Sequence, residues 1–220
     1  MLQIKSRRAG KVMYGVSDVK SFAIKTLPDF DPEEAEAYNA APAESPAPVL
    51  ELLTKMLRKR RDIYTAQKND ADVKRTDKVF RIASELQNGG WFDGVEFALA
   101  HMDLFPRNML INADGKGNVN DPAITATVDW DDALFVPAFV GCSPPSFLWS
   151  QPGVSDLGAD EIKQSFDEAA GVLYTQYAYK LAYKMARRVF LLALKGIDQK
   201  NYDWLVERWE DIKKVPRYGH

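Results

Sequence analysis

The sequence has a single cysteine, Cys142, among its 220 residues. One cysteine excludes an intrachain disulfide, and a reducing compartment is then the simpler expectation. Neither of the two histidines, His101 and His220, stands where it would activate the thiol as a nucleophile. We therefore predict that Cys142 is a buried structural thiol.

Long hydrophobic runs are also lacking. No apolar stretch reaches the roughly 18 residues that a membrane-spanning helix requires, and residues 1–8 have no apolar core of signal-peptide length. The formal net charge is only −2, which gives no general attraction to nucleic acid or to an anionic membrane. We expect a soluble, cytoplasmic protein with neither nucleic acid nor a membrane as a partner.

Most of the chain instead has a helical apolar pattern. Apolar residues recur at intervals of three and four between residues 49 and 86, and again between 173 and 212. Asn88-Gly89-Gly90 and Gly196 are helix stop signals, and Asp198 is a candidate N-cap for a last helix. With 46% hydrophobic residues, these helices have enough apolar surface to form a packed core.

Residues 1–48 are the least regular part of the chain. Residues 12–14 and 21–25 have the composition of short strands, and residues 32–38 resemble a short acidic helix. The Pro/Ala-rich segment 41–48 fits neither a helical nor a strand period. We interpret this part as an irregular N-terminal extension or the remnant of a lobe.

A β-hairpin is predicted in the middle of the chain. Residues 109–112 and 124–128 are short runs rich in apolar and β-branched residues, and the segment between them contains Asp-Gly and Asp-Pro turn signals. In an antiparallel hairpin, the residue that enters the first strand lies beside the residue that leaves the second. Asn108 and Asp129 are therefore expected to be neighbours. The predicted fold is mainly α with this one small hairpin, an α+β class.

The residues at the base of the hairpin have the chemistry of a cation site. Asp103 precedes Asn108 closely enough to face the same pocket. An amide oxygen and carboxylates converging on a small volume suit a hard divalent cation such as Mg²⁺, which keeps water sites that phosphate groups can share. The residues alone therefore indicate the smallest set of functional groups that phosphoryl transfer requires.

The ordered pattern His101-x-Asp103-Leu104-x-x-x-Asn108, followed by an apolar strand ending in Asp129-Trp130-Asp131, resembles the kinase-like phosphotransferase superfamily. Within it, the sequence is similar to the aminoglycoside/choline/homoserine phosphotransferase-like group, and especially to its fungal members. That group shows H-G-D-L-H-P-x-N followed by I-D-W/F-x-D-A. The resemblance covers residues 49–215 and implies the C-terminal helical lobe of the kinase-like fold.

The resemblance also implies a role for each site residue. Asp103 would orient the acceptor hydroxyl and take its proton, and His101 would support the catalytic loop by bracing the metal-binding aspartate. Asn108 and Asp129 would hold Mg²⁺ against the phosphates of ATP, with Asp131 as a lesser candidate there or in acceptor binding. The implied reaction moves phosphate from ATP to a hydroxyl of a small-molecule acceptor.

Two departures from the family pattern matter. In the catalytic loop, Met102 replaces the usual small residue, Phe105 the usual second histidine and Arg107 a common glycine. Upstream, Phe22-Ala23-Ile24-Lys25 resembles the strand motif V-A-I-K and makes Lys25 the candidate nucleotide-binding lysine, yet no G-x-G-x-x-G loop accompanies it. The alternative prediction is a truncated, catalytically impaired family member that acts as a non-catalytic binding module or persists as a remnant.

Overall fold

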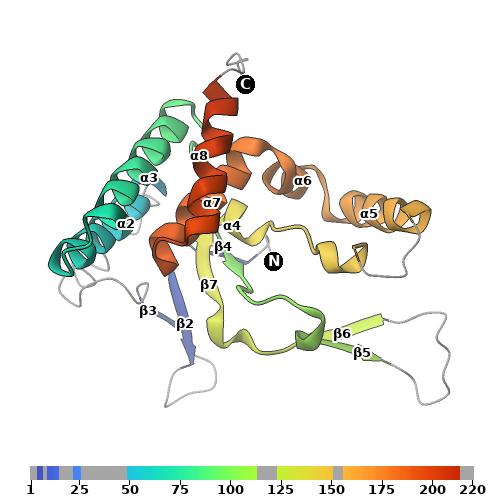
Figure 1. The fold of residues 1–220 in the computed structure, drawn as a ribbon. Helices are drawn as coiled ribbons and strands as arrows, with labels where there is room; N and C mark the ends of the chain where they lie inside the picture. Colours follow the sequence, from blue (N-terminus) through green and yellow to red (C-terminus); the bar gives the residue numbers. More distant parts are fainter. Residues whose placement is uncertain are drawn as a thin grey trace.

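The computed structural model describes residues 4–6, 9–14, 22–25, 49–112, 123–150 and 156–213. The acidic helix predicted at 32–38 and the linker predicted at 41–48 lie outside these residues. Within the described part, helices are the main element and the strands form two small antiparallel sheets (Figure 1). The prediction of a mainly helical α+β fold is confirmed.

Four long helices form the body of the protein (Figure 1). α2 (Val49–Ala66) and α3 (Asp70–Asn88) pack side by side, and α7 (Leu181–Lys195) contacts both of them as well as α8 (Gln199–Lys213). The other described helices are α4 (Ala138–Gly141), α5 (Asp156–Ala170) and α6 (Val172–Tyr179), with 3-10 turns η1 (Pro106–Asn108), η2 (Trp130–Asp132) and η3 (Ser146–Leu148). No helix in the described ranges has the length and apolar character needed to cross a membrane.

Several helices begin or end at capping residues, two of which were expected from the sequence. The side chain of Asn69 caps α3 by accepting a hydrogen bond from the backbone N–H of Asp72. Asp198 caps α8 as predicted, because its carboxylate accepts from the N–H of Asn201 at 2.9 Å. α7 ends at Gly196, whose φ of 96° lies in the left-handed region that glycine adopts without strain.

A five-stranded antiparallel sheet joins distant parts of the chain. Its strands follow the order β1-β4-β7-β2-β3. They are β1 (Lys5–Ser6), β2 (Gly10–Tyr14), β3 (Phe22–Lys25), β4 (Phe97–Ala100) and β7 (Leu134–Pro137). The strands predicted near 12–14 and 21–25 are thus confirmed as β2 and β3. The sheet itself was not predicted. After residue 48 the sequence predicted no β-structure other than the hairpin, so β4 and β7 were not expected.

The central pair of this sheet is β4 with β7. Phe97 lies opposite Pro137, and Ala100 lies opposite Leu134. β2 then pairs with β7 at Leu134 and Phe135, so the first strands of the chain extend the same sheet. The segment between Ala100 and Leu134 contains the candidate site residues, and this pairing holds its two ends together.

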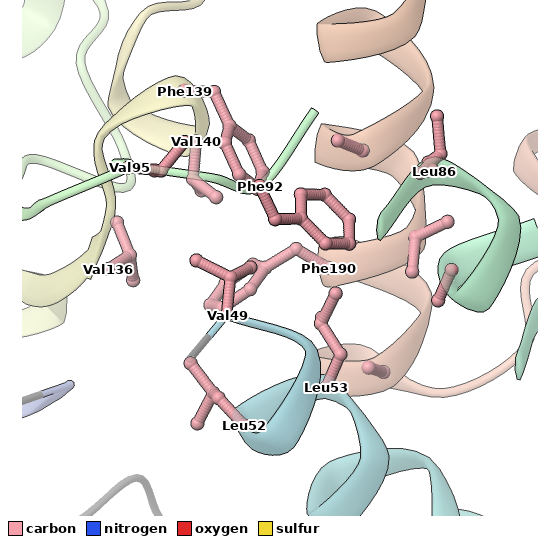
Figure 2. Close-up of a cluster of buried hydrophobic side chains, with 14 of the residues drawn as sticks. Val49, Leu52, Leu53, Leu86, Phe92, Val95, Val136, Phe139, Val140 and Phe190 are labelled. Atoms are coloured by element: carbon pink, nitrogen blue, oxygen red, sulfur yellow. The ribbon is translucent and has the colours of Figure 1, made fainter. Parts of the chain in front are cut away.

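The core lies between the long helices on one side and β4, β7 and α4 on the other. Figure 2 shows Leu53 of α2, Leu86 of α3 and Phe190 of α7 converging from three helices, and each is at most 1% exposed. Phe139 of α4 stacks on Phe92, with ring centroids 5.9 Å apart. Burying each such side chain contributes about 1.5–3 kcal/mol. The core therefore fixes β4, β7 and α4 against the helices.

Arg187 of α7 fastens the chain that follows the sheet. Its guanidinium donates to the backbone carbonyls of Phe139 at 3.0 Å, Cys142 at 2.8 Å and Tyr177 at 2.9 Å. Burial lowers the pKa of Arg187 from its usual value and raises the pKa of the Cys142 thiol to about 12. Cys142 is 1% exposed, so the prediction of a buried thiol is confirmed.

Replacing Arg187 by methionine keeps most of the side-chain volume but removes the donors to three carbonyls. We expect the free energy of unfolding to fall by about 2–4 kcal/mol, because a buried carbonyl left without a donor costs about 1–3 kcal/mol. Urea unfolding measures the change, with Arg81→Met on the exposed side of α3 as the control. Equal losses in the two variants would contradict this role of Arg187.

Candidate functional site

The candidate residues other than Lys25 lie on one excursion of the chain out of the five-stranded sheet. The excursion leaves β4 at Ala100, passes through η1, forms a hairpin, and returns through η2 to Leu134 in β7. In Figure 1 the hairpin projects away from the helices at the far end of this excursion. The two ends of the excursion are fixed by the pairing of β4 with β7. Residues far apart in sequence therefore meet near the base of the hairpin.

The predicted hairpin is present. β5 (Met109–Asn112) pairs antiparallel with β6 (Ala123–Thr127), and Met109 lies opposite Thr127. The next pair, toward the base of the hairpin, is joined by a hydrogen bond from the backbone N–H of Val128 to the carbonyl of Asn108, at 2.9 Å. Asn108 therefore lies beside the residue that immediately precedes Asp129.

The side chain of Asn108 points from this pair back to the loop that contains Asp103. Its amide nitrogen donates to the backbone carbonyl of Asp103 at 2.8 Å and to Asp103 Oδ2 at 3.2 Å. Both partners only accept, which decides which end of the amide carries the nitrogen. Asn108 is 5% exposed, and no described residue donates to its Oδ1. A buried oxygen is thus left available as a ligand.

His101 joins the same two parts of the site. Its Nε2 lies 2.9 Å from the carbonyl oxygen of Val128, and its Nδ1 accepts the backbone N–H of Asp103 at 3.3 Å. These contacts require the proton on Nε2, which donates to Val128. Trp130 packs on the imidazole, with ring centroids 4.7 Å apart, and its indole N–H donates to the Thr127 carbonyl. His101 is therefore a buried side chain that holds the Asp103 loop to the end of the hairpin.

Asp129 has a strained backbone. Its φ of 64° and ψ of 54° lie in the left-handed region, and Lys68 is the other non-glycine residue with positive φ in the described ranges. Holding a non-glycine residue there costs of order 1–3 kcal/mol, and such strain concentrates at functional sites. The turn η2 that follows Asp129 is closed by a hydrogen bond from Ala133 to Trp130.

The turn η2 and the residue before it carry three exposed carboxylates. Asp129, Asp131 and Asp132 are all exposed, and no described residue donates a hydrogen bond to any of them. Within the described ranges, no three His, Cys, Asp or Glu side chains form a group that could hold a metal ion. The Asn108 oxygen adds a ligand of another type. Mg²⁺ usually takes one or two carboxylates and completes its shell with water and phosphates. A carboxylate of this turn and the Asn108 oxygen are donors of the types that Mg²⁺ takes.

The carboxylate of Asp103 has a second partner that the sequence did not assign. Arg107 Nη2 donates to Asp103 Oδ2 at 2.5 Å, and the guanidinium carbon lies 4.7 Å from the centre of the Phe105 ring. The side chain of Arg107 is 62% exposed and that of Asp103 is 31% exposed. The spacing of four residues between opposite charges is a signal for such a pair, but it is a weak one outside a long helix.

Lys25 lies on a different part of the protein. It is in β3, one of the two edge strands of the five-stranded sheet, and is paired in register with Lys11 of β2. β2 separates it from β7 and from the excursion that carries His101, Asp103, Asn108 and Asp129. A cavity of about 450 Å³ between α5 and α6 is also lined by none of the candidate residues.

Comparisons with models of known protein families, with curated proteins and with solved structures found no match to this chain. The case for a function therefore depends on the sequence motifs and on the geometry described above.

Replacing His101 by alanine removes the brace between Asp103 and Val128. We expect the free energy of unfolding to fall by about 1–3 kcal/mol, because the Val128 carbonyl loses the donor that the buried His101 supplies and a cavity forms beneath Trp130. Thr125→Ala removes an exposed hydrogen bond to the Leu110 carbonyl and is a control from the same region. The account is contradicted if urea unfolding shows no larger loss for His101→Ala than for this control.

Proposed function

We propose that the chain carries the catalytic and metal-binding segment of a kinase-like phosphotransferase, similar to the aminoglycoside/choline phosphotransferase-like group. The proposed reaction transfers the γ-phosphate of ATP to a hydroxyl of a small-molecule acceptor. In this proposal, residues 49–215 correspond to the C-terminal helical lobe of the kinase-like fold. The motif around His101 and Asp103 and the hairpin that follows it support the proposal.

One observation carries the proposal. The Asn108 side chain hydrogen-bonds Asp103, while the Asn108 backbone hydrogen-bonds Val128, the residue before Asp129. One buried residue, Asn108, thus links the loop aspartate through its side chain to the residue before the hairpin aspartate through its backbone. Catalysis of phosphoryl transfer depends mainly on positioning and on electrostatic stabilisation, and this link supplies positioning.

Asp103 is the proposed proton acceptor. One oxygen of its carboxylate accepts from Arg107 and Asn108, and the other has no donor among the described residues. We propose that this second oxygen accepts a hydrogen bond from the hydroxyl of the acceptor molecule. As the hydroxyl oxygen bonds to the γ-phosphorus, the bond between that phosphorus and the bridging oxygen of ADP breaks, and the hydroxyl proton passes to Asp103.

Asn108 and Asp129 are the proposed metal ligands. Asn108 Oδ1 is held in place because the nitrogen of the same amide is fixed by two hydrogen bonds. Asp129 is held by the turn η2 and by the His101 contact to the preceding carbonyl. Mg²⁺ bound between them would neutralise charge on the phosphates of ATP. Asp131 stands in the same turn and is assigned a supporting role.

A second candidate is a module that binds a partner without catalysis. It is favoured by the position of Lys25 in an edge strand, separated by β2 from β7, where strand pairing does not bring it to the base of the hairpin. A phosphotransferase without a lysine on its nucleotide phosphates loses part of the charge stabilisation that gives its rate. Calorimetry of the purified chain with Mg²⁺ and ATP separates the candidates, since binding at micromolar ATP counts against this one.

Asp103→Asn tests the proposed chemistry. The substitution keeps the size of the side chain and an oxygen for Arg107 but removes the proton acceptor, so we expect the rate of ADP formation from Mg-ATP to fall about 10²- to 10⁴-fold. The assay is run with mixed small-molecule alcohols as acceptors.

Asp77→Asn is the matched control, because Asp77 is also an exposed aspartate paired with an arginine, Arg61, at 2.9 Å. It is expected to leave the rate unchanged. ADP formation that is the same in the parent chain and in both variants would overturn the proposed role of Asp103.

A further inference from the structure

The guanidinium of Arg107 lies on the exposed side of Asp103. Asn108 and Arg107 both donate to Asp103 Oδ2, but Asn108 is 5% exposed whereas the side chain of Arg107 is 62% exposed. The buried partner belongs to the proposed metal ligands. The exposed partner therefore stands on the side from which an acceptor would approach the carboxylate.

Most donors of this guanidinium have no hydrogen-bond partner among the described residues. Asp103 is the hydrogen-bond partner that the described residues provide for Arg107, and it takes one of the five N–H groups. The Phe105 ring, 4.7 Å away, supports one face of the plane and is itself 46% exposed. The remaining N–H groups form the fork that binds a carboxylate or a phosphate with two parallel hydrogen bonds.

The ion pair with Asp103 is easily exchanged. Exposed pairs of this kind contribute only about 0–1 kcal/mol, so a competing anion displaces or shares the guanidinium at little cost. The rest of the site is acidic, with exposed carboxylates at Asp129, Asp131 and Asp132. Arg107 is the one Lys or Arg in the described part of the excursion, 101–112 and 123–132. An anionic acceptor would find its counter-charge there.

We infer that Arg107 selects acceptors that carry a carboxylate or a phosphate close to the hydroxyl that is phosphorylated. The inference rests on the proposed function, because it takes Asp103 as the group that receives the acceptor hydroxyl. The anion binds the Arg107 fork, and the neighbouring hydroxyl then reaches the Asp103 oxygen that has no donor among the described residues. Arg107 is a specificity residue in this scheme.

Four compounds with one three-carbon skeleton test the inference. Glycerate and glycerol phosphate carry an anion, glycerol is neutral and aminopropanediol is cationic. Binding to the full chain is followed through the side-chain ¹⁵N signal of Arg107, without ATP. We expect the two anions to shift this signal and the other two compounds to leave it unchanged.

Two variants serve as comparison. Binding of the anions to Arg107→Gln, followed through the backbone signals of the loop, is expected to weaken about tenfold or more, since a charge-assisted hydrogen bond contributes about 1.5–3 kcal/mol. Arg61→Gln, which changes another exposed arginine paired with an aspartate, is expected to bind as the parent does. Failure of the anions to bind, or equal binding by the two variants, would overturn the inference.

ADP formation from Mg-ATP in the same samples separates this inference from the proposed function. Anion binding at Arg107 without ADP formation from any compound would leave the anion site standing and count against phosphotransfer. ADP formation that is fastest with glycerol or aminopropanediol, and unchanged in Arg107→Gln, would support phosphotransfer and exclude Arg107 as the specificity residue.

Discussion

The antiparallel pairing of β4 with β7 is the constraint on which the candidate site depends. It sets Ala100 opposite Leu134 and so closes the excursion that holds all the central site residues. The pairing is itself fixed by burial, because Phe97 and Val136 are fully buried and Phe139 follows directly in α4. Arg187 then joins α4, its C-cap Cys142 and α6 by donating to the carbonyls of three residues. The helical core therefore acts on the site through one pair of short strands.

Two buried polar side chains complete the arrangement at the base of the hairpin. His101 joins the Asp103 backbone to the Val128 carbonyl, and Asn108 joins the Asp103 side chain to the Val128 backbone. Buried polar groups are expensive when unpaired, so each contact favours the one conformation in which both are satisfied. This conformation holds Asp129 in its left-handed backbone geometry. Strain, burial and exposed carboxylates then occur together in a few residues, which is typical of functional sites.

Local patterns in the sequence predicted the long helices, the Asp198 cap and the hairpin, because periodicity, capping and turn signals act over a few residues. The hairpin prediction placed Asn108 beside Asp129, whereas the structure joins Asn108 to Val128, one residue earlier. The five-stranded sheet was missed, since strands as short as β4 give no clear period and their partners lie far away in sequence. The helical pattern also gave no warning that α6 ends at Tyr179 and α7 begins at Leu181, with extended backbone at Lys180. The contact of Arg107 with Asp103 depends on the turn η1, whose geometry only the fold supplies.

The central claim is that Asn108 and Asp129 bind a divalent cation at the base of the hairpin. Manganese titration of the ¹⁵N-labelled chain tests it most directly, because Mn²⁺ replaces Mg²⁺ at oxygen sites and broadens the signals of nearby amides. The account predicts that broadening begins at residues 103, 108 and 128–132 and is lost in Asp129→Asn, while the acidic helix α5 is affected later. Broadening that begins at α5, or that is unchanged in Asp129→Asn, would contradict the account.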